Sequence, residues 1–124
     1  MLRVPRATDV AQTTGADFET AMRDFGHWME KALAFVENRY GIGVVERSCL
    51  EFLAARPEGS RQDAVGEYLR LSVGETRALV SRLARRGYAR RERAPSDPDV
   101  FIVHAVSENN DVMAIVAARR ALLD

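Results

Sequence analysis

SRQDAVGEYLRLSVGETRALVSRLARRGYARRERAPSDPDVFIVHAV, residues 60–106, contains two helix-capping signals in close succession. Asp63 follows Ser60 by three residues, and Glu75 follows Ser72 by the same interval. In such a pair the serine hydroxyl accepts a hydrogen bond from a backbone N–H of the first helical turn, and the acid accepts one from the backbone N–H of the serine. The repeated signal predicts two short helices joined by a tight turn, which is a helix-turn-helix arrangement.

Both predicted helices have one apolar face. The first, of about ten residues, carries the stripe Ala64, Val65, Tyr68 and Leu69. In the second, Gly87 stands where a left-handed C-terminal cap is expected, and the candidates for burial are Val73, Thr76, Leu79, Val80 and Leu83. The opposite face of this second helix is small and cationic, with one acid: Gly74, Glu75, Arg77, Ala78, Ser81, Arg82 and Arg85.

A small and cationic helix face suits the major groove of DNA. We therefore predict DNA contacts for Ser72, Gly74, Glu75, Arg77, Ser81, Arg82 and Arg85. For Glu75 two roles are open, because its carboxylate can accept a hydrogen bond from a cytosine amino group or serve only as the capping partner of Ser72.

Two strand-like runs follow, at 88–93 and 100–106, and a Pro- and Asp-rich stretch at 94–99 joins them. Prolines fit a loop or a sheet edge and hinder a central strand, so this stretch predicts the tip of a β-hairpin wing. The first run carries a cluster of cations, Arg90, Arg91 and Arg93, which would contact the minor groove or the phosphates; the alternative is a solvated strand edge. The predicted fold class is thus mainly α with a small β-hairpin wing, a winged helix-turn-helix.

The run LRLSVGETRALVSRLARRGYARRE, residues 69–92, resembles the second helix-turn-helix half of MarR-family winged-helix transcriptional regulators. In that family a leucine-serine turn leads into a recognition helix that ends in Leu-x-x-x-Gly-hydrophobic-x-x-Arg. The matching residues of this chain are Leu71, Ser72, Leu83, Gly87, Tyr88 and Arg91. The likeness extends over most of the chain from about residue 44 and is sharp over 71–93.

Two features of the wing depart from the family pattern. The family's wing tip usually carries Asp-x-Arg, an ion pair that braces the wing, whereas this chain has Asp97-Pro98-Asp99. These acids would be repelled by phosphate unless they pair inward with the wing arginines. The next strand of the family usually ends in Leu-Thr with a glycine three residues on, whereas here it ends in Val106-Ser107 with Asn110 near the place of the glycine.

The resemblance implies a homodimer whose two recognition helices enter successive major grooves of a pseudo-palindromic operator, about 34–36 Å apart. It also implies a cleft between the dimer helices and the winged body, where small aromatic ligands often release such regulators from DNA. Trp28, Met29 and Phe35 are our candidates for lining this effector pocket, although Met and aromatic residues at helical spacing are also typical of an ordinary core. No cofactor is expected.

Positive charge is concentrated on the helix-turn-helix and the first wing strand. The chain has 18 basic and 18 acidic residues, so its net charge is zero. Residues 61–93 nevertheless hold nine arginines against four acids, and both flanking parts are net acidic. Because arginine binds phosphates and guanine edges well, this distribution favours a nucleic-acid partner although the total charge does not.

A long helix is predicted for residues 15–40, with Gly41 and Gly43 ending it. One apolar line recurs at intervals of four and three, as in a coiled coil: Phe18, Met22, Phe25, Met29, Ala32, Val36 and Arg39/Tyr40. A second line, Ala21, Trp28 and Phe35, repeats every seven residues. Two lines indicate two neighbours, and we infer that one is the winged body and the other a second subunit; the alternative is a helix covered on both sides within one chain.

The remaining segments complete a single winged-helix domain, residues 15–124, preceded by a flexible arm at 1–14. A helix at 44–56 places Val45, Cys49, Phe52 and Leu53 on one face. A last helix at 107–123, capped by Ser107, is expected to join the long helix in dimerisation.

The composition suits one folded domain without an enzyme site. The chain has 124 residues, of which 47% are hydrophobic and 29% charged. A helix that spans a membrane needs about 20 apolar residues in a row, and no apolar run of this sequence comes near that length. With no secretory signal and a single cysteine, we expect a cytoplasmic protein. Cys49 is either an inert small hydrophobe or a redox sensor.

The sequence offers no enzyme site. His27 and His104 are the only histidines, and because no metal-ligand spacing or phosphate loop accompanies them, we assign no catalytic residue and no metal.

A second interpretation is a winged helix that binds protein and has lost sequence-specific DNA binding. The zero net charge, the missing wing arginine and the acidic wing tip favour it. Salt dependence discriminates between the two interpretations, because a DNA-binding protein loses affinity steeply as the salt concentration rises.

Overall fold

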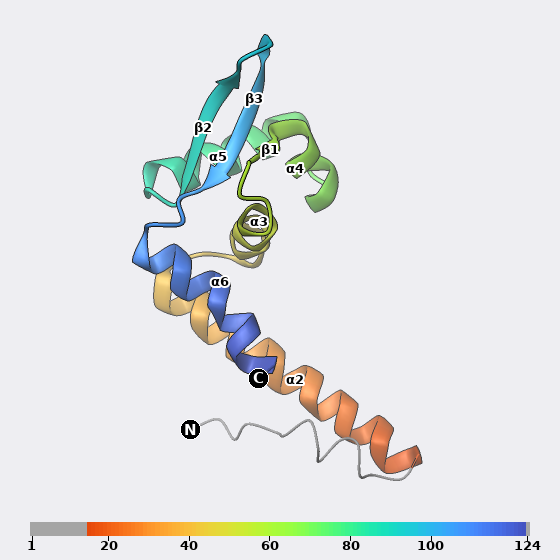
Figure 1. Ribbon diagram of the computed structural model, residues 1–124. Coiled ribbons are helices and arrows are strands. Elements are labelled where there is room, and N and C mark those ends of the chain that lie inside the picture. Colours follow the sequence, from red (N-terminus) through yellow and green to blue (C-terminus); the bar gives the residue numbers. More distant parts are fainter. Residues whose placement is uncertain (1–14, 124) are drawn as a thin grey trace.

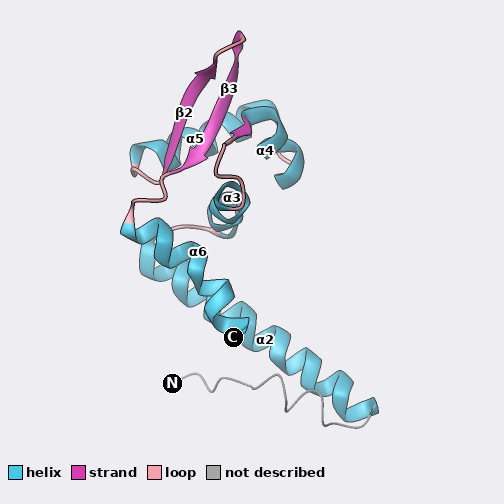
Figure 2. Ribbon diagram, viewed as in Figure 1, coloured by secondary structure: helices cyan, strands magenta, loops and turns pink. Residues whose placement is uncertain are grey.

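The computed structural model describes residues 15–123, with side chains from 17 to 121, so the predicted arm at 1–14 lies outside the described residues. Helices surround a small sheet, which confirms the predicted fold class (Figure 1, Figure 2). The elements in chain order are α2 (Gly15–Tyr40), α3 (Val44–Ala54), β1 (Ser60–Arg61), α4 (Gln62–Leu69), α5 (Val73–Arg85), β2 (Ala89–Ala94), β3 (Asp97–Ala105) and α6 (Asn110–Leu123). The helix predicted at 44–56 therefore ends two residues earlier than expected.

The sheet is antiparallel with the order β1-β3-β2, and β2 and β3 form the predicted wing. The predicted tip at 94–99 is too long, because β3 already begins at Asp97 and only Pro95 and Ser96 separate the two strands. Pro98 is tolerated inside β3 because β1 pairs only with Ile102 and Val103, which leaves the early part of β3 as a sheet edge.

The predicted capping box at Ser60 is wrong. Ser60 is paired with Val103 in the sheet, and its hydroxyl donates to the Arg61 carbonyl at 3.2 Å. Because the backbone of Ser60 is extended in β1, α4 begins only at Gln62 and spans 8 residues, with Arg61 as an N-cap whose side chain makes no capping hydrogen bond. On its apolar stripe Val65 is buried, whereas Tyr68 is exposed and stacks on Phe52.

The predicted cap of the last helix is also displaced. The backbone N–H of Val106 donates to Tyr88, and a turn at 106–109 then delays the helix to Asn110. The capping residue is Asn109, whose Oδ1 accepts from the N–H groups of Asp111 (2.8 Å) and Val112 (3.3 Å). The amide nitrogen of Asn109 donates to the Gly87 carbonyl at 3.1 Å and so ties α6 to the end of α5.

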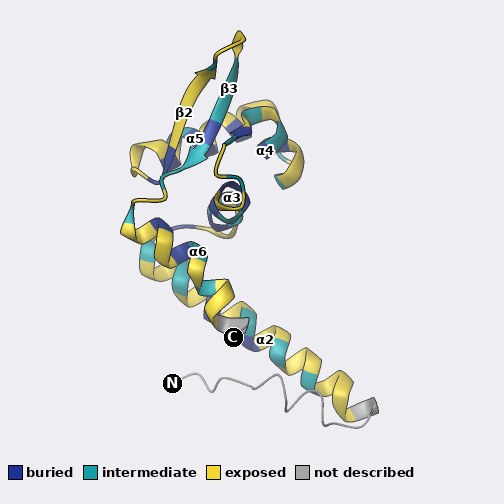
Figure 3. Cartoon of the chain, viewed as in Figure 1, coloured by how far each residue is buried: buried dark blue, intermediate teal, exposed yellow. Residues whose placement is uncertain are grey.

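The core lies between α3, α4, α5, the sheet and the start of α6 (Figure 3). Its fully buried side chains are Cys49, Leu50, Leu53, Val65, Leu79, Val80, Leu83, Val103, Val112 and Ile115. Six of the residues predicted for the core are among them: Cys49 and Leu53 of α3, Val65 of α4, and Leu79, Val80 and Leu83 of α5. Val45 and Val73 are not, because each belongs to the first turn of its helix and is exposed.

The long helix α2 has the predicted bounds and packs beside α6 (Figure 1). Its N-terminal half continues past the end of α6. Of the predicted apolar lines, Trp28 and Ala32 are buried, whereas Phe18, Met22 and Phe35 are exposed, Phe35 by 67%. No helix within residues 15–123 has the length and hydropathy needed to cross a bilayer.

Candidate nucleic-acid interface

The helix α5 is capped at both ends by the residues that its sequence predicts. The Ser72 hydroxyl accepts from the Glu75 N–H at 3.1 Å, and a Glu75 carboxylate oxygen accepts from the Ser72 N–H at 2.9 Å. At the other end Gly87 has a φ of 76°, and the N–H of Tyr88 donates to the Leu83 carbonyl. This pattern is a Schellman cap, so both predicted boundaries of the helix are confirmed.

Replacing Glu75 with glutamine is expected to remove a pH-dependent part of the stability. The hydrogen bond from the Ser72 backbone N–H lowers the pKa of the Glu75 carboxyl from its ordinary value. Such a carboxyl stabilises the fold above its unfolded-state pKa, and this contribution is lost as the pH falls through the folded-state pKa. Glutamine keeps an acceptor without the charge. Thermal melting should therefore separate wild type from Glu75→Gln at about pH 7, and the difference should shrink as the pH falls below the ordinary range of a carboxyl pKa.

Apart from Val73, which was predicted to be buried and is exposed, the two faces of α5 divide as predicted. Thr76, Leu79, Val80 and Leu83 are buried, and the Thr76 hydroxyl donates to the Ser72 carbonyl at 2.8 Å. The opposite face is exposed apart from the half-buried Ser81, and its middle consists of small side chains: Gly74, Ala78 and Ser81. Small residues let a helix backbone come close to the floor of a groove, so this face is shaped for a concave partner.

The arginines of α5 separate into free and occupied groups. Arg77 and Arg85 make no hydrogen bond or ion pair with any residue in the described range 15–123. Arg82 pairs with Glu46 of α3, with 3.6 Å between Nε and Oε1. Arg86, just past the helix end, donates to the Gly41 carbonyl at 2.6 Å and to the Tyr40 carbonyl. Of the cations predicted to contact DNA from this helix, Arg77 and Arg85 are thus the ones without a protein partner.

The three wing arginines do not form one cluster, because successive side chains of a strand point to opposite faces. The guanidinium groups of Arg91 and Arg93 both lie against the ring of Phe101, with their Cζ atoms 4.8 Å and 5.0 Å from its centroid. Arg91 also donates to Gln62 at the start of α4, at 3.4 Å. Arg90 is paired across the strands with His104 on the other face, where it is exposed.

The acids of the wing tip do not pair with the wing arginines. Asp97 Oδ1 accepts from the backbone N–H of Asp99 at 3.0 Å. Arg93, the nearest cation along β2, donates to the Pro98 carbonyl. The family's bracing ion pair is thus replaced by a contact between a guanidinium and the backbone, and both carboxylates are left at the exposed end of the wing.

A hollow of about 360 Å³ lies between the starts of α4 and α5 and the wing strand β3. Arg61 and Arg77 stand on its rim, with Thr76 and Phe101 in its wall. Arg61 pairs with Asp63 through two contacts of 3.0 Å and 3.1 Å. The pairing raises the pKa of Arg61 and lowers that of Asp63, chiefly through their side-chain hydrogen bonds.

Sequence reasoning missed three polar residues that shape this surface: Arg61, Glu46 and Arg86. Arg61 was absent from the predicted contacts because Ser60 was expected to cap the helix. Arg86 has a local signal, since it directly precedes the predicted Gly87 cap, where cations interact favourably with a helix C-terminus. Glu46 has none, because its contact with Arg82 joins residues 36 positions apart.

The predicted effector residues occupy different surroundings. Trp28 is buried on α2, Met29 is half-buried and Phe35 is exposed. An apolar hollow of about 460 Å³ lies between the end of α3, the end of β3 and α6. Leu53, Val112, Met113 and Val116 line it, and Arg56 and Arg120 border it.

The remaining candidates for chemistry are Cys49 and the histidines. Cys49 is fully buried, and burial raises the pKa of its thiol to about 12, so the reactive thiolate is suppressed. His104 contacts a carboxylate oxygen of Glu92 at 2.8 Å. Across residues 15–123 no three His, Cys, Asp or Glu side chains come together in a way that could hold a metal ion.

No protein-family model and no curated protein matches the sequence. Among solved structures, the DNA complex of MepR from S. aureus has a TM-score of 0.70 and 17% identity, covering 85% of this chain and 83% of MepR. The YusO protein from Bacillus subtilis has a TM-score of 0.68 and 12% identity, with 96% and 82% covered. A MarR-family transcriptional regulator from Rhodococcus has a TM-score of 0.62 and 20% identity, with 91% and 77% covered. The capped helix α5, the wing and the paired α2 and α6 therefore build the winged-helix fold that MarR-family regulators share.

Proposed function

We propose that this chain is a cytoplasmic DNA-binding transcriptional regulator, without enzymatic activity, that uses α5 as its recognition helix. The observation that carries the proposal is the exposed face of α5, where small residues are flanked by the unpaired cations Arg77 and Arg85. Such a face admits close approach to base edges and supplies charge for phosphates. The MepR relative of the same fold has been solved with DNA, which supports the proposal by analogy.

The proposed regulator acts as a homodimer on a pseudo-palindromic operator. Support comes from α2, which at 26 residues is about 39 Å long and exposes Phe18, Met22 and Phe35. Phe18 and Met22 lie one helical turn apart on one apolar line of α2, Phe35 belongs to the other line, and exposed apolar side chains of this size are typical of an interface. Sedimentation equilibrium of the full chain tests the dimer directly.

A small apolar or aromatic effector is the remaining part of the proposal. Besides Trp28, Met29 and Phe35, the hollow beside α6 supports it, because apolar walls with a few polar groups at the rim are typical of small-molecule sites. Stabilisation of the protein by members of a panel of aromatic acids, measured by thermal melting, tests this part.

Replacing Arg77 and Arg85 together with alanine is expected to weaken binding to duplex DNA from the gene's own upstream region at least tenfold. Each arginine that contacts a phosphate contributes about 0.9 to the slope of log affinity against log salt, so the slope should fall by up to about 1.8. The measurement is a fluorescence-anisotropy titration at two salt concentrations, with a scrambled duplex as competitor.

The matched control is the alanine replacement of Arg23 and Lys31, two exposed cations on α2. It removes the same charge from a helix outside the helix-turn-helix and the wing, and its affinity should stay close to wild type. If wild type showed no preference for the upstream duplex over the scrambled one, the DNA-binding assignment would be wrong. The protein-binding alternative, which the unpaired acids of the wing tip favour, would then lead.

A further inference from the structure

Arg82 of α5 and Arg86, just past its end, connect the proposed recognition helix to the corner between α2 and α3. Arg86 donates to the carbonyls of Tyr40 and Gly41, at the C-terminal end of α2. This is a favourable place for a cation, because the negative end of the helix dipole lies there. Arg82 lies on the same side of α5 and pairs with Glu46 in the first turn of α3.

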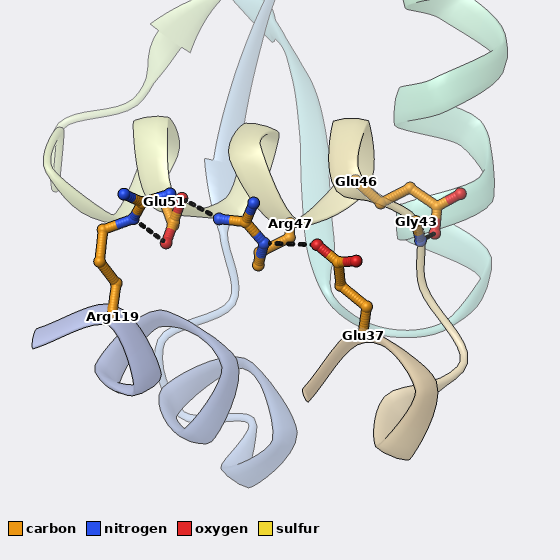
Figure 4. A network of polar contacts seen from close by, with 6 residues as sticks. All are labelled: Glu37, Gly43, Glu46, Arg47, Glu51 and Arg119. Carbon is orange, nitrogen blue, oxygen red and sulfur yellow. Dashed lines mark hydrogen bonds and ion pairs between the residues drawn. The ribbon is translucent and has the colours of Figure 1, made fainter. Parts of the chain in front are cut away.

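Glu46 is held by a second contact, at the start of its own helix α3. Its Oε2 accepts from the backbone N–H of Gly43 at 3.3 Å, as part of the capping box of α3 (Figure 4). The Glu46 side chain is 21% exposed, whereas that of Arg82 is 50% exposed. The acid is therefore the anchored member of the pair, and the arginine is the member with room to turn toward another anion.

We propose that Glu46 competes with DNA phosphate for Arg82 and thereby sets the affinity of the recognition helix. The inference rests on the DNA-binding function proposed above. A partly exposed ion pair is weak, and Arg82 meets Glu46 through a single contact of 3.6 Å, whereas a guanidinium can bind a phosphate through two parallel hydrogen bonds. Arg82 must leave Glu46 to make that contact, so it contributes less to DNA binding than an unopposed cation such as Arg85.

The test is the variant Glu46→Gln. The glutamine oxygen still accepts the Gly43 N–H, so the cap of α3 is kept while the charge that holds Arg82 is removed. Duplex DNA from the upstream region should bind about two- to fivefold tighter. The salt slope should rise by up to about 0.9, because one more phosphate contact is made.

Two further variants separate this role from a general effect of charge. Glu67→Gln removes one exposed acid from α4, which also belongs to the winged body, and gives the gain expected from net charge alone. Glu46→Gln combined with Arg82→Ala removes the competing cation as well, so the specific gain should disappear. Melting midpoints of all variants show whether the fold is intact.

A gain in Glu46→Gln that exceeds the gain in Glu67→Gln and vanishes in the Arg82→Ala background supports the proposal. The proposal is overturned if wild type binds the duplex and Glu46→Gln binds it no tighter than Glu67→Gln, or if the gain persists without Arg82. In both of those cases the DNA-binding function stands. If wild type does not select the duplex at all, the proposed function fails and this inference fails with it.

Discussion

Replacing Arg47 with methionine is expected to lower the free energy of unfolding by about 3–5 kcal/mol, because it removes the counter-ion of the mostly buried Glu37 carboxylate and one of the two cations that pair with Glu51. Arg47 is 5% exposed in the middle of α3. Its Nε donates to Glu37 of α2 at 2.7 Å, and a terminal nitrogen donates to Glu51 at 2.8 Å (Figure 4). Glu51 in turn accepts from Arg119 of α6 at 3.2 Å. The network therefore joins three helices.

Urea denaturation of wild type and Arg47→Met measures this loss. The matched control is the triple variant that also carries Glu37→Gln and Glu51→Gln, in which no charge is stranded. Its stability should recover most of the difference, because replacing a buried ion pair by neutral groups is often nearly neutral in free energy. If Arg47→Met alone were as stable as wild type, water would have to solvate the carboxylates of Glu37 and Glu51, and the network would not be stabilising.

Replacing Gly59 with alanine is expected to cost about 2–5 kcal/mol, from backbone strain and overpacking together. Gly59 has a φ of 90°, a conformation that L side chains rarely adopt. A Cβ atom would lie 2.5 Å from Cε1 of His104 and 2.7 Å from Cγ2 of Ile102. Both side chains belong to β3, so relief of the clash would push the turn away from the β1–β3 ladder.

Gly26→Ala is the control of opposite sign. It lies in the interior of α2, and an added Cβ has no atom within 4 Å in the described structure. Alanine should stabilise this helix by up to about 1 kcal/mol. Equal melting midpoints for Gly59→Ala and wild type would contradict this prediction, because they would mean that the backbone of the turn before β1 can adjust to the added Cβ without cost.

Local signals in the sequence predicted the elements that depend on nearby residues. The Ser72–Glu75 box and Gly87 define α5 within one turn at each end, and both contacts span only a few residues. The interval pattern of α2 likewise located the whole helix. For these elements backbone capping and helical periodicity are sufficient.

The two misplaced helix caps concern groups whose partner is distant in the chain. Ser60 has the residue spacing of a cap, but its backbone is taken by Val103 in the sheet. Ser107 has a capping side chain, but the pairing of Val106 with Tyr88 delays the helix until Asn109 can cap it. No local rule competes with such long-range hydrogen bonds.

Long-range contacts also explain why the roles of the individual arginines could not be predicted. Nine arginines between 61 and 93 predicted a basic surface. Their individual roles depend on which acids and carbonyls come near after folding. Arg82 pairs with Glu46, and Arg86 donates to backbone carbonyls at the end of α2. Arg77 and Arg85 have no such partner in the described part of the chain. Charge counting therefore located the surface without distinguishing the cations on it.

The burial of Trp28 gives the protein an intrinsic optical reporter. Trp28 is the only tryptophan of the chain, it is 8% exposed, and its ring centroid lies 6.0 Å from that of Phe25. Tryptophan fluorescence therefore follows the surroundings of α2 alone, while circular dichroism follows all helices. An unfolding transition seen by fluorescence before circular dichroism changes would show α2 detaching while the winged body is still folded.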